Sequence, residues 1–488
     1  MGERREFAGR LVVVLLPFAI AVAVAGMTIW SSSSRREFLL LILGLLVPLP
    51  LIVRGLQHRL DPFEPIAVLS VALFALFVLR PIAHLAYGKM TYADLSLDAG
   101  FDSALTVAAF GVAALYCGYA APAGRRIAQL LRPLPNAVKP EATTMVAVGL
   151  VVIGFLLYAV YIEQVGGLGV AKRLLSGRDP LEGSITSSGT VYFLFGPFLA
   201  IPATLLLFEA AAAKRRALSL LLIALGTGLV VILVAGPRGD RLWLMLLALG
   251  VFVLPYLRAQ KRPRIRTVAV ISLLWFAVGI TFLADVRVPI ARQGSPLELF
   301  KKTATNPLRG WHNFVLGADT EMFSILALET ERVPSSQAHE PGITLLSLAT
   351  NWIPRRFYPT KPVTADEKVY TMLLPKQASY SKAGTAPSIF GGFYYDSGLV
   401  GVLIGSMLFG VLARALYEYL LKYPASAGVR LLYASTLPFI IVLLRGNPTD
   451  TLARMLYIVF PILITLWLTG RRGSESVNVR TASVGVAG

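Results

Sequence analysis

The chain has 488 residues, 56% of them hydrophobic, and a mean hydropathy of +0.67. Apolar runs long enough to cross a bilayer recur from end to end, which excludes a water-soluble globular protein and predicts a polytopic membrane protein. The net charge of +19 could suit nucleic acid. In a membrane protein, however, Lys and Arg accumulate in cytoplasmic loops, so we expect no nucleic-acid partner.

Cysteine and histidine usage excludes several kinds of site. The only cysteine, Cys117, lies in an apolar run, which excludes disulfides and thiolate metal sites. The four histidines, His58, His84, His312 and His339, lack the spacing of a zinc motif. We therefore expect no metal and no cofactor.

The apolar runs must be helices, because lipid offers no partner to an open sheet edge or an irregular backbone. The first run could be a signal peptide. It lacks a clear small-residue cleavage site, however, and a second apolar run follows at once, so we expect a retained helix. The predicted spans are 11–30, 38–53, 65–87, 103–121, 143–163, 188–209, 217–235, 241–256, 267–284, 388–413, 429–444 and 451–469. The predicted fold is an all-α polytopic integral membrane protein of about twelve transmembrane helices.

This pattern divides the chain into four parts. Residues 1–285 form an N-terminal bundle of about nine helices, and 286–387 form one long external loop that contains short interfacial helices. Residues 388–470 form the C-terminal transmembrane helices, and 471–488 form a disordered cytoplasmic tail.

The distribution of Lys and Arg predicts the orientation. With the N-terminus inside, the cytoplasmic segments hold more than twice as many cations as the short external loops, so both termini are expected in the cytoplasm. The first external turn, 31–37, opposes this rule because it carries Arg35 and Arg36, whereas Arg80 is counted in the next external loop.

The long loop contains two predicted short helices. Residues 319–332 place apolar side chains at helical spacing, with Asp319 as a candidate N-cap, and should lie on the interface or on the bundle. Residues 342–353 are too short to cross the bilayer, which favours a re-entrant or interfacial helix.

Cations near the expected external face are candidates for binding a phosphate. Arg238 and Arg241 flank the tight turn at 236–241 and could converge on one anion, or could reach lipid headgroups instead. Further inside a span, Arg454 is expected to form a structural ion pair with Asp450. The other candidate cations are Arg287, Arg355, Arg356, Lys361 and Arg445.

Acidic residues and one histidine on the same side are candidates for a general base. Glu321, His339 and Asp319 are the leading ones, and Glu340, Asp366, Glu367 and Asp396 are others. Each carboxylate also has a structural interpretation: Asp319 as an N-cap, Glu321 as a first-turn charge, and Asp366 and Glu367 as solvated loop charges.

Four stretches of the C-terminal half, taken in order, resemble the bacterial oligosaccharide repeat unit polymerases, also called O-antigen or Wzy-type polymerases. They are the turn GPRGDR (236–241), the stretch IPRRFYPTKP (353–362), the Gly-rich start of a span PSIFGGFYYDSGLVG (387–401), and Arg445 with Gly446. Before residue 236 the resemblance is limited to a series of spans.

The resemblance implies a metal-independent, inverting membrane glycosyltransferase of polysaccharide biosynthesis, serving lipopolysaccharide, capsule or exopolysaccharide. It would transfer the growing glycan from undecaprenyl pyrophosphate to the non-reducing-end hydroxyl of an incoming undecaprenyl-pyrophosphate-linked repeat unit. The site would face the periplasm or cell exterior from the bacterial inner membrane, with membrane lipids and a chain-length regulator protein as partners. Its arginines would bind pyrophosphate.

Two alternatives stay open. An O-antigen ligase has similar topology and donor chemistry but transfers the glycan to lipid A core. A lipid-linked oligosaccharide flippase or other transporter would instead carry charges or broken helices near the bilayer midplane. Enzymes that use polyprenyl monophosphate sugars commonly need an acidic pair in a sizeable first external loop, and the short turn at 31–37 argues against them.

Overall fold

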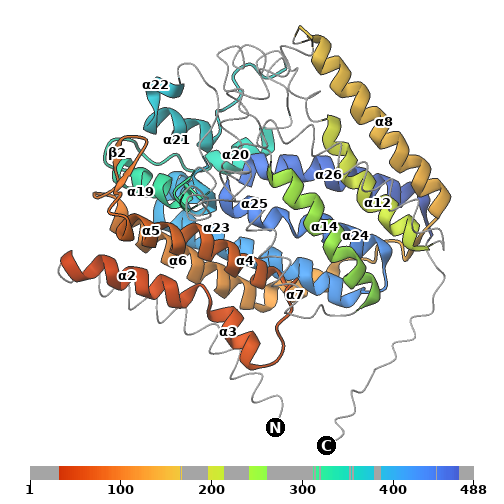
Figure 1. Ribbon diagram of the computed structural model, residues 1–488, viewed down its shortest axis with the longest axis horizontal. Helices are drawn as coiled ribbons and strands as arrows, with labels where there is room; N and C mark the ends of the chain where they lie inside the picture. Colours follow the sequence, from red (N-terminus) through yellow and green to blue (C-terminus); the bar gives the residue numbers. More distant parts are fainter. Residues whose placement is uncertain are drawn as a thin grey trace, which may run out of the picture.

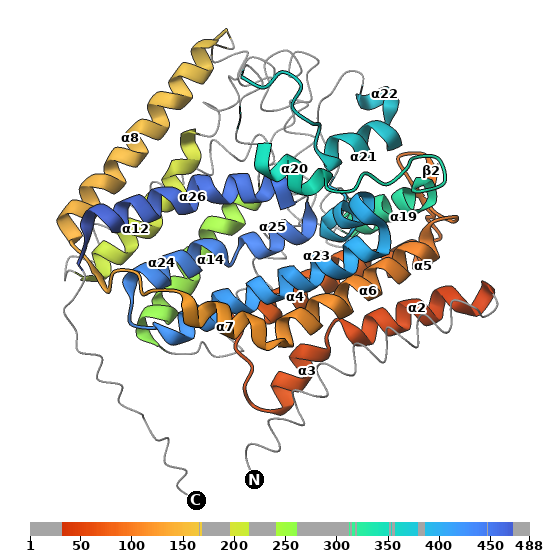
Figure 2. The same ribbon diagram turned by 180° about the vertical axis from the view of Figure 1, so that it is seen from behind.

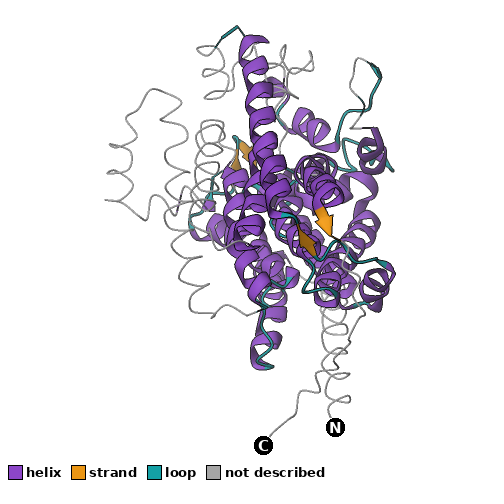
Figure 3. Cartoon of the chain, turned by 90° about the vertical axis from the view of Figure 1, so that its right-hand side faces the viewer, coloured by secondary structure: helices purple, strands orange, loops and turns teal. Residues whose placement is uncertain are grey.

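The structure is a computed structural model, and it describes residues 32–164, 166–167, 196–213, 241–260, 312, 315–317, 320–350, 353, 357–378, 386–446 and 448–471. This part of the chain is largely helical (Figures 1 and 3). The helices are α2 (Ser32–Leu46), α3 (Leu49–Leu56), α4 (Pro65–Leu73), the π-helix η1 (Phe74–Leu79), α5 (Arg80–Ala86), α6 (Phe101–Ala120), α7 (Pro122–Leu130), α8 (Pro140–Gln164), the 3-10 helix η2 (Gly196–Leu199), α12 (Ala200–Ala213), α14 (Arg241–Ala259), α19 (Met322–Arg332), α20 (Ile343–Thr350), α21 (Ala365–Leu373), α22 (Pro375–Ala378), α23 (Ser388–Lys422), α24 (Ala427–Thr436), α25 (Phe439–Arg445) and α26 (Pro448–Thr469). The strands are β1 (Thr91–Tyr92), which pairs antiparallel with β2 (Leu95–Ser96), and β3 (Ala137–Val138), which pairs antiparallel with β4 (Gly470–Arg471).

Six helical stretches within the described ranges are long and apolar enough to cross a membrane, which confirms the prediction of a helical membrane protein. They are Arg35–Leu56, Pro65–Ala86, Phe101–Ala120, Pro140–Gln164, Ser388–Lys422 and Ala427–Arg445. Shorter apolar helices at Ala200–Ala211, Leu249–Ala259 and Met455–Thr469 lie where three more spans are predicted. The spans predicted at 11–30, 217–235 and 267–284 lie outside the described residues, so the total of twelve stays a prediction.

The short elements gather at the two ends of the bundle (Figures 1 and 2). The β1–β2 hairpin, α19 and α21 lie together at one end, which we call the loop end. Helix α7 and the α3–α4 connection lie at the other, which we call the α7 end. These described segments, some predicted to be external and others cytoplasmic, are therefore separated in space, and the side of the membrane that each end faces stays a prediction.

Helices α6 and α23 touch through their backbones. A Cβ at Gly118 of α6 would overlap the carbonyl oxygen of Met407, and a Cβ at Gly410 of α23 would overlap that of Leu115. Small residues allow such close approach, and the resulting dispersion contacts hold helices together in a membrane, where there is little hydrophobic driving force. The α6–α23 contact therefore fixes the helix whose first turns carry the Gly-rich motif.

Replacing Gly118 with valine is expected to destabilise the protein by about 3 kcal/mol, because the new side chain would push two backbones apart. Thermal unfolding in detergent measures the effect. Gly149 of α8 is the matched control, since a Cβ there meets no atom within 4 Å. An equal loss of stability in Gly149→Val would mean that helix propensity, and not close packing at Gly118, causes the loss.

Helix α2 already begins at Ser32, so the prediction of an external turn at 31–37 is wrong from that residue onward. Arg36 on its first turns donates through Nε to Oδ1 of Asp102 at 2.9 Å and through Nη1 to Oδ1 of Asp98 at 3.2 Å. These two carboxylates, distant in sequence, compensate the cation that opposes the charge rule. The tertiary ion pairs explain why this arginine is tolerated at the loop end.

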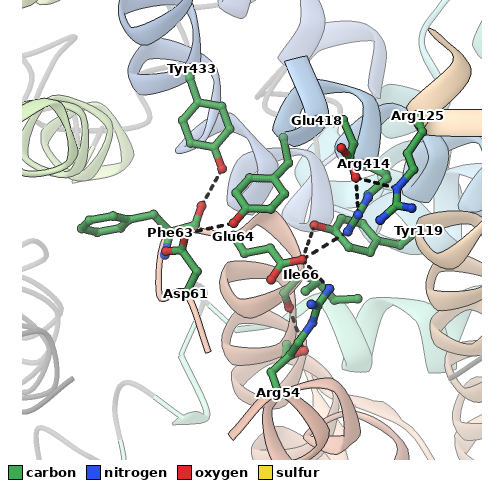
Figure 4. Close-up of polar contacts among 12 residues, drawn as sticks. Arg54, Asp61, Phe63, Glu64, Ile66, Tyr119, Arg125, Arg414, Glu418 and Tyr433 are labelled. Atoms are coloured by element: carbon green, nitrogen blue, oxygen red, sulfur yellow. Dashed lines mark hydrogen bonds and ion pairs between the residues drawn. The ribbon is translucent and has the colours of Figure 1, made fainter. Parts of the chain in front are cut away.

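A buried ionic cluster joins helices at the α7 end (Figure 4). Glu64, just before α4, is 2% exposed. Its Oε1 accepts hydrogen bonds from Nη2 of Arg54 at 2.7 Å and from the Tyr119 hydroxyl at 2.9 Å, and it lies 3.4 Å from Nη1 of Arg414. One carboxylate therefore compensates cations from two segments that lie far apart in the sequence.

Replacing Glu64 with glutamine is expected to destabilise the protein by about 3 kcal/mol, because it removes the buried charge that compensates Arg54 and, together with Glu418, Arg414. Denaturant unfolding in detergent measures the loss. Asp98→Asn is the control: its carboxylate also pairs with an arginine but is 61% exposed, so a change below about 0.5 kcal/mol is expected. Wild-type stability of Glu64→Gln would show that this cluster does not hold the helices.

Candidate functional site

Helix α19 is the buried element of the long loop. The sequence predicts a helix over 319–332 with Asp319 as its N-cap, but the helix starts at Met322 and Glu321 occupies the cap position without a side-chain cap bond. Asp319 itself lies outside the described residues. Residues 322–329 are all buried, and α19 packs against α6 and α23. Of the two predicted locations, the structure therefore selects the bundle over the interface.

Arg80 holds the chain that leads into α19. It is 1% exposed, and its Nη1 donates to the carbonyl oxygens of Val315 at 3.0 Å and Gly317 at 2.6 Å and to Oγ1 of Thr320 at 3.1 Å. Its Nε donates to Oγ of Ser324 at 3.1 Å. The prediction that Arg80 lies in an external loop is wrong, because Arg80 starts α5 inside a candidate span. Its guanidinium group donates to carbonyls of the long loop.

Glu321, a predicted base, lies beside this network. Its Oε2 accepts a hydrogen bond from the Tyr92 hydroxyl of β1 at 2.5 Å, and it interacts electrostatically with Arg80. The carboxylate thus already has a donor and a cationic neighbour, and it helps to hold the β1–β2 hairpin on α19.

His339, the second predicted base, lies against a break in α23. Ser397 and Gly398 leave the helical conformation, and Gly398 has φ +62°, a region that favours glycine. A Cβ at Gly398 would lie 3.2 Å from Nε2 of His339, and the imidazole contacts the Tyr394 ring edge-on at 5.4 Å. His339 is half-buried, and its buried Nδ1 has no hydrogen-bond partner among the described residues.

Glu340, the neighbour of His339, connects α21 to α23. Oε2 accepts a hydrogen bond from Nζ of Lys368, and Oε1 accepts one from the Tyr395 hydroxyl at 2.8 Å. Desolvation acts to raise the pKa of Glu340, but the hydrogen bonds from Lys368 and Tyr395 lower it below its ordinary value. Glu340 is therefore an ionised link that fixes the segment carrying His339.

Helix α20 brings a third element to this end. The backbone N–H of Thr344 donates to Oδ1 of Asp396 on α23 at 3.0 Å, and the Thr449 hydroxyl of α26 donates to the Thr344 carbonyl oxygen at 3.2 Å. Arg445, the last residue of α25, precedes Thr449 of α26 by four residues, and the chain between them leaves the helix at Gly446. The fold thus brings Arg445 to the same end of the bundle as His339.

Helix α21 corrects another prediction. Asp366 and Glu367 are not solvated loop charges: they form the first turn of α21, where the Thr364 hydroxyl accepts the N–H of Glu367 at 3.4 Å. Both side chains are half-buried, and Oδ1 of Asp366 is buried. The signal Thr-x-x-Glu, a capping box, was present in the sequence.

Glu329 is a residue that the sequence analysis missed. It is 0% exposed, neither carboxylate oxygen has a hydrogen-bond partner in the described part, and a Cβ at Gly391 would lie 2.6 Å from Oε2. Burial raises the pKa of Glu329 well above its ordinary value, and the charge of Asp366 raises it further. Its spacing of seven from Met322 and three from Leu326 places it on the apolar face of α19, which was a readable signal.

The predicted cations divide into two groups. The side chains of Lys361 and Arg445 are among those described. Nζ of Lys361 donates to the Ile353 carbonyl oxygen at 3.4 Å, so these two residues lie close together. Arg241 begins α14, and its side chain lies outside the description. Outside the described residues are Arg238, Arg287, Arg355 and Arg356, as are the side chains of Asp450 and Arg454.

The comparisons with known proteins give one match. The family model for O-antigen polysaccharide polymerase Wzy matches residues 17–472. A search among curated proteins and among solved structures found no match. The family match covers nearly the whole chain and includes all four sequence stretches that resemble such polymerases, so this chain belongs to the O-antigen polysaccharide polymerase Wzy family.

Proposed function

We propose that this membrane polymerase extends a glycan carried on undecaprenyl pyrophosphate. It transfers the growing chain to the non-reducing-end hydroxyl of an incoming repeat unit that is itself linked to undecaprenyl pyrophosphate. The observation that carries the proposal is the family match over residues 17–472. Members of this family act on lipid-linked repeat units in membranes, in polysaccharide biosynthesis.

In the reaction, the acceptor hydroxyl oxygen attacks the anomeric carbon of the donor while the bond from that carbon to the pyrophosphate oxygen breaks. The lipid pyrophosphate leaves with the bonding electrons, and the anomeric configuration inverts. Negative charge grows on the leaving group, so fixed guanidinium groups stabilise the transition state more than the ground state. No metal is needed in this scheme.

His339 takes the acceptor proton. It is half-buried, its Nδ1 has no partner among the described residues, and it lies on the break of α23 where the Gly-rich motif ends. Glu321 is less suited, because Tyr92 and Arg80 already engage its carboxylate. Asp319 stays a candidate.

Arg445, Lys361 and Arg241 bind pyrophosphate, together with four arginines that lie outside the described residues. Arg445 supports this role because it ends α25 four residues before Thr449, whose hydroxyl donates to the Thr344 carbonyl oxygen at the start of α20. A guanidinium group can donate two parallel hydrogen bonds to one phosphate. The remaining cations are Arg238, Arg287, Arg355 and Arg356.

The loop end faces the periplasm or cell exterior, both termini lie in the cytoplasm, and the protein is in the bacterial inner membrane. The support is the excess of Lys and Arg in the segments predicted to be cytoplasmic, of which α7 and the α3–α4 connection lie at the α7 end. Membrane lipids and a chain-length regulator are its partners.

Reconstitution in liposomes with a lipid-pyrophosphate-linked repeat unit as the sole substrate tests this function. The expected result is a ladder of longer glycans and release of one undecaprenyl pyrophosphate per unit added. Elongation only after lipid A core is supplied would instead indicate a ligase. Movement of substrate between leaflets without elongation would indicate a flippase.

A further inference from the structure

The first turns of α23 and the break that follows them carry three residues that lie against Glu329 or His339. They are Gly391, Tyr394 and, at the break, Gly398. Gly391 makes room for Glu329, and Gly398 makes room for His339. Tyr394 lies between them: it interacts electrostatically with Glu329 and contacts the His339 ring.

Helix α21 covers Glu329 from the side of the loop. Asp366 on its first turn interacts electrostatically with Glu329, while Val369, 0% exposed, and Leu373, 3% exposed, are buried beneath the helix. At the far end of α21, Nη1 of Arg332 donates to the Met372 carbonyl oxygen at 2.5 Å. This hydrogen bond holds the last turn of α21 to the end of α19.

We call α21 docked when it packs against α19 in this way. The docked helix also fixes the segment that carries His339. Lys368, two residues after Asp366, donates a hydrogen bond to the Glu340 carboxylate. Glu340 in turn accepts from the Tyr395 hydroxyl and donates its N–H to the Tyr395 carbonyl oxygen at 3.2 Å. A displacement of α21 would break the first of these links next to the imidazole.

We propose that Glu329 is a positioning residue for His339, and that it performs this role only while its carboxyl carries a proton. The inference rests on the proposed function of His339. A neutral carboxyl can remain beside Asp366 in apolar surroundings, whereas an ionised Glu329 would be buried without water and would be repelled by the charge of Asp366. Ionisation of Glu329 therefore undocks α21, which releases Lys368 from Glu340 and the His339 segment from its place.

The direction of the pH dependence follows from linkage. Burial and Asp366 raise the pKa of Glu329 in the docked form, so the docked form binds the proton more tightly than the undocked form. Docking is therefore strongest at low pH and weakens as the pH rises above the ordinary pKa of a carboxyl group. Among the described residues, Tyr394 and Tyr395 of α23 also interact electrostatically with Glu329.

Cysteine labelling of the full-length protein in detergent tests the docking step without any substrate. In a Cys117→Ser background, Val369→Cys places a thiol beneath α21, and Thr371→Cys places one on its exposed side as the matched control for thiol reactivity. The ratio of the two labelling rates with a membrane-impermeant maleimide is expected to rise about tenfold between about pH 6 and about pH 9. A ratio that does not change with pH would overturn the proposal.

Two substitutions test the cause. In Glu329→Gln the side chain stays neutral, so the labelling ratio should stay at its low-pH value. In Asp366→Asn the repulsion is absent but the desolvation of Glu329 remains, so the ratio should rise less than in the wild type. If both variants instead follow the wild-type increase, another group controls α21. Elongation activity gives a second readout: Glu329→Gln should remove the alkaline fall of the pH–rate profile, an effect that a purely structural role would not produce. If His339 is not the base, the labelling result still holds and only the link to activity fails.

Discussion

Replacing His339 with alanine is expected to lower the elongation rate by about 10²–10⁴-fold, the usual contribution of a general base. The acceptor hydroxyl would then have to lose its proton to water as it attacks. Because the imidazole acts on the transition state, the loss should appear in kcat, with little change in KM for the acceptor. Release of undecaprenyl pyrophosphate from reconstituted protein measures the rate.

His58 is the matched control for this substitution. It lies exposed between α3 and α4, at the α7 end, so His58→Ala should leave elongation at the wild-type rate. If His339→Ala keeps more than about a tenth of the activity, the base is another group. Glu321→Gln is then the next variant to measure, because Glu321 is the other leading candidate base among the described residues.

Replacing Arg445 with lysine is expected to lower elongation by about 10²-fold, although the positive charge stays. An ammonium group acts as a point charge and cannot donate the two parallel hydrogen bonds by which a guanidinium binds a phosphate. If Arg445 contacts the leaving pyrophosphate, kcat should fall more than the affinity for the donor lipid. Single-turnover rates with saturating donor separate the two effects.

Arg59 gives the corresponding control. It is an exposed arginine at the α7 end, so Arg59→Lys should not change elongation. A reduced donor affinity with normal kcat in Arg445→Lys would mean that the residue binds ground and transition states equally. Wild-type behaviour in both parameters would remove Arg445 from the proposed site.

Several features of the site could be predicted from residue spacing, and others could not. The Gly-rich motif was recognised, but the reason for its glycines appears only in the structure: Gly391 admits Glu329 and Gly398 admits His339. Both partners lie in the long loop, dozens of residues earlier. Sequence reasoning has no means of pairing a glycine with a distant side chain, although Glu329 already occupied the apolar face of its helix.

The errors have a common cause in contacts between distant segments. Arg36 is tolerated at a position that the charge rule disfavours because Asp98 and Asp102 bind it. Arg80 can be buried because carbonyls of the long loop accept its hydrogen bonds. The charge rule treats each cation as if it faced lipid headgroups or water. It therefore fails where the fold supplies a partner.

The sequence by itself determined that this protein spans a membrane through helices and which family motifs it carries, because hydrophobic length and local spacing are properties of neighbouring residues. Only the tertiary structure decided where α19 lies, that the Glu329 carboxyl is buried without a hydrogen-bond partner among the described residues, and how α21 joins His339 to Glu329. These depend on packing between segments far apart in the chain, where close backbone approach and desolvation give a residue a role that its neighbours in sequence do not reveal.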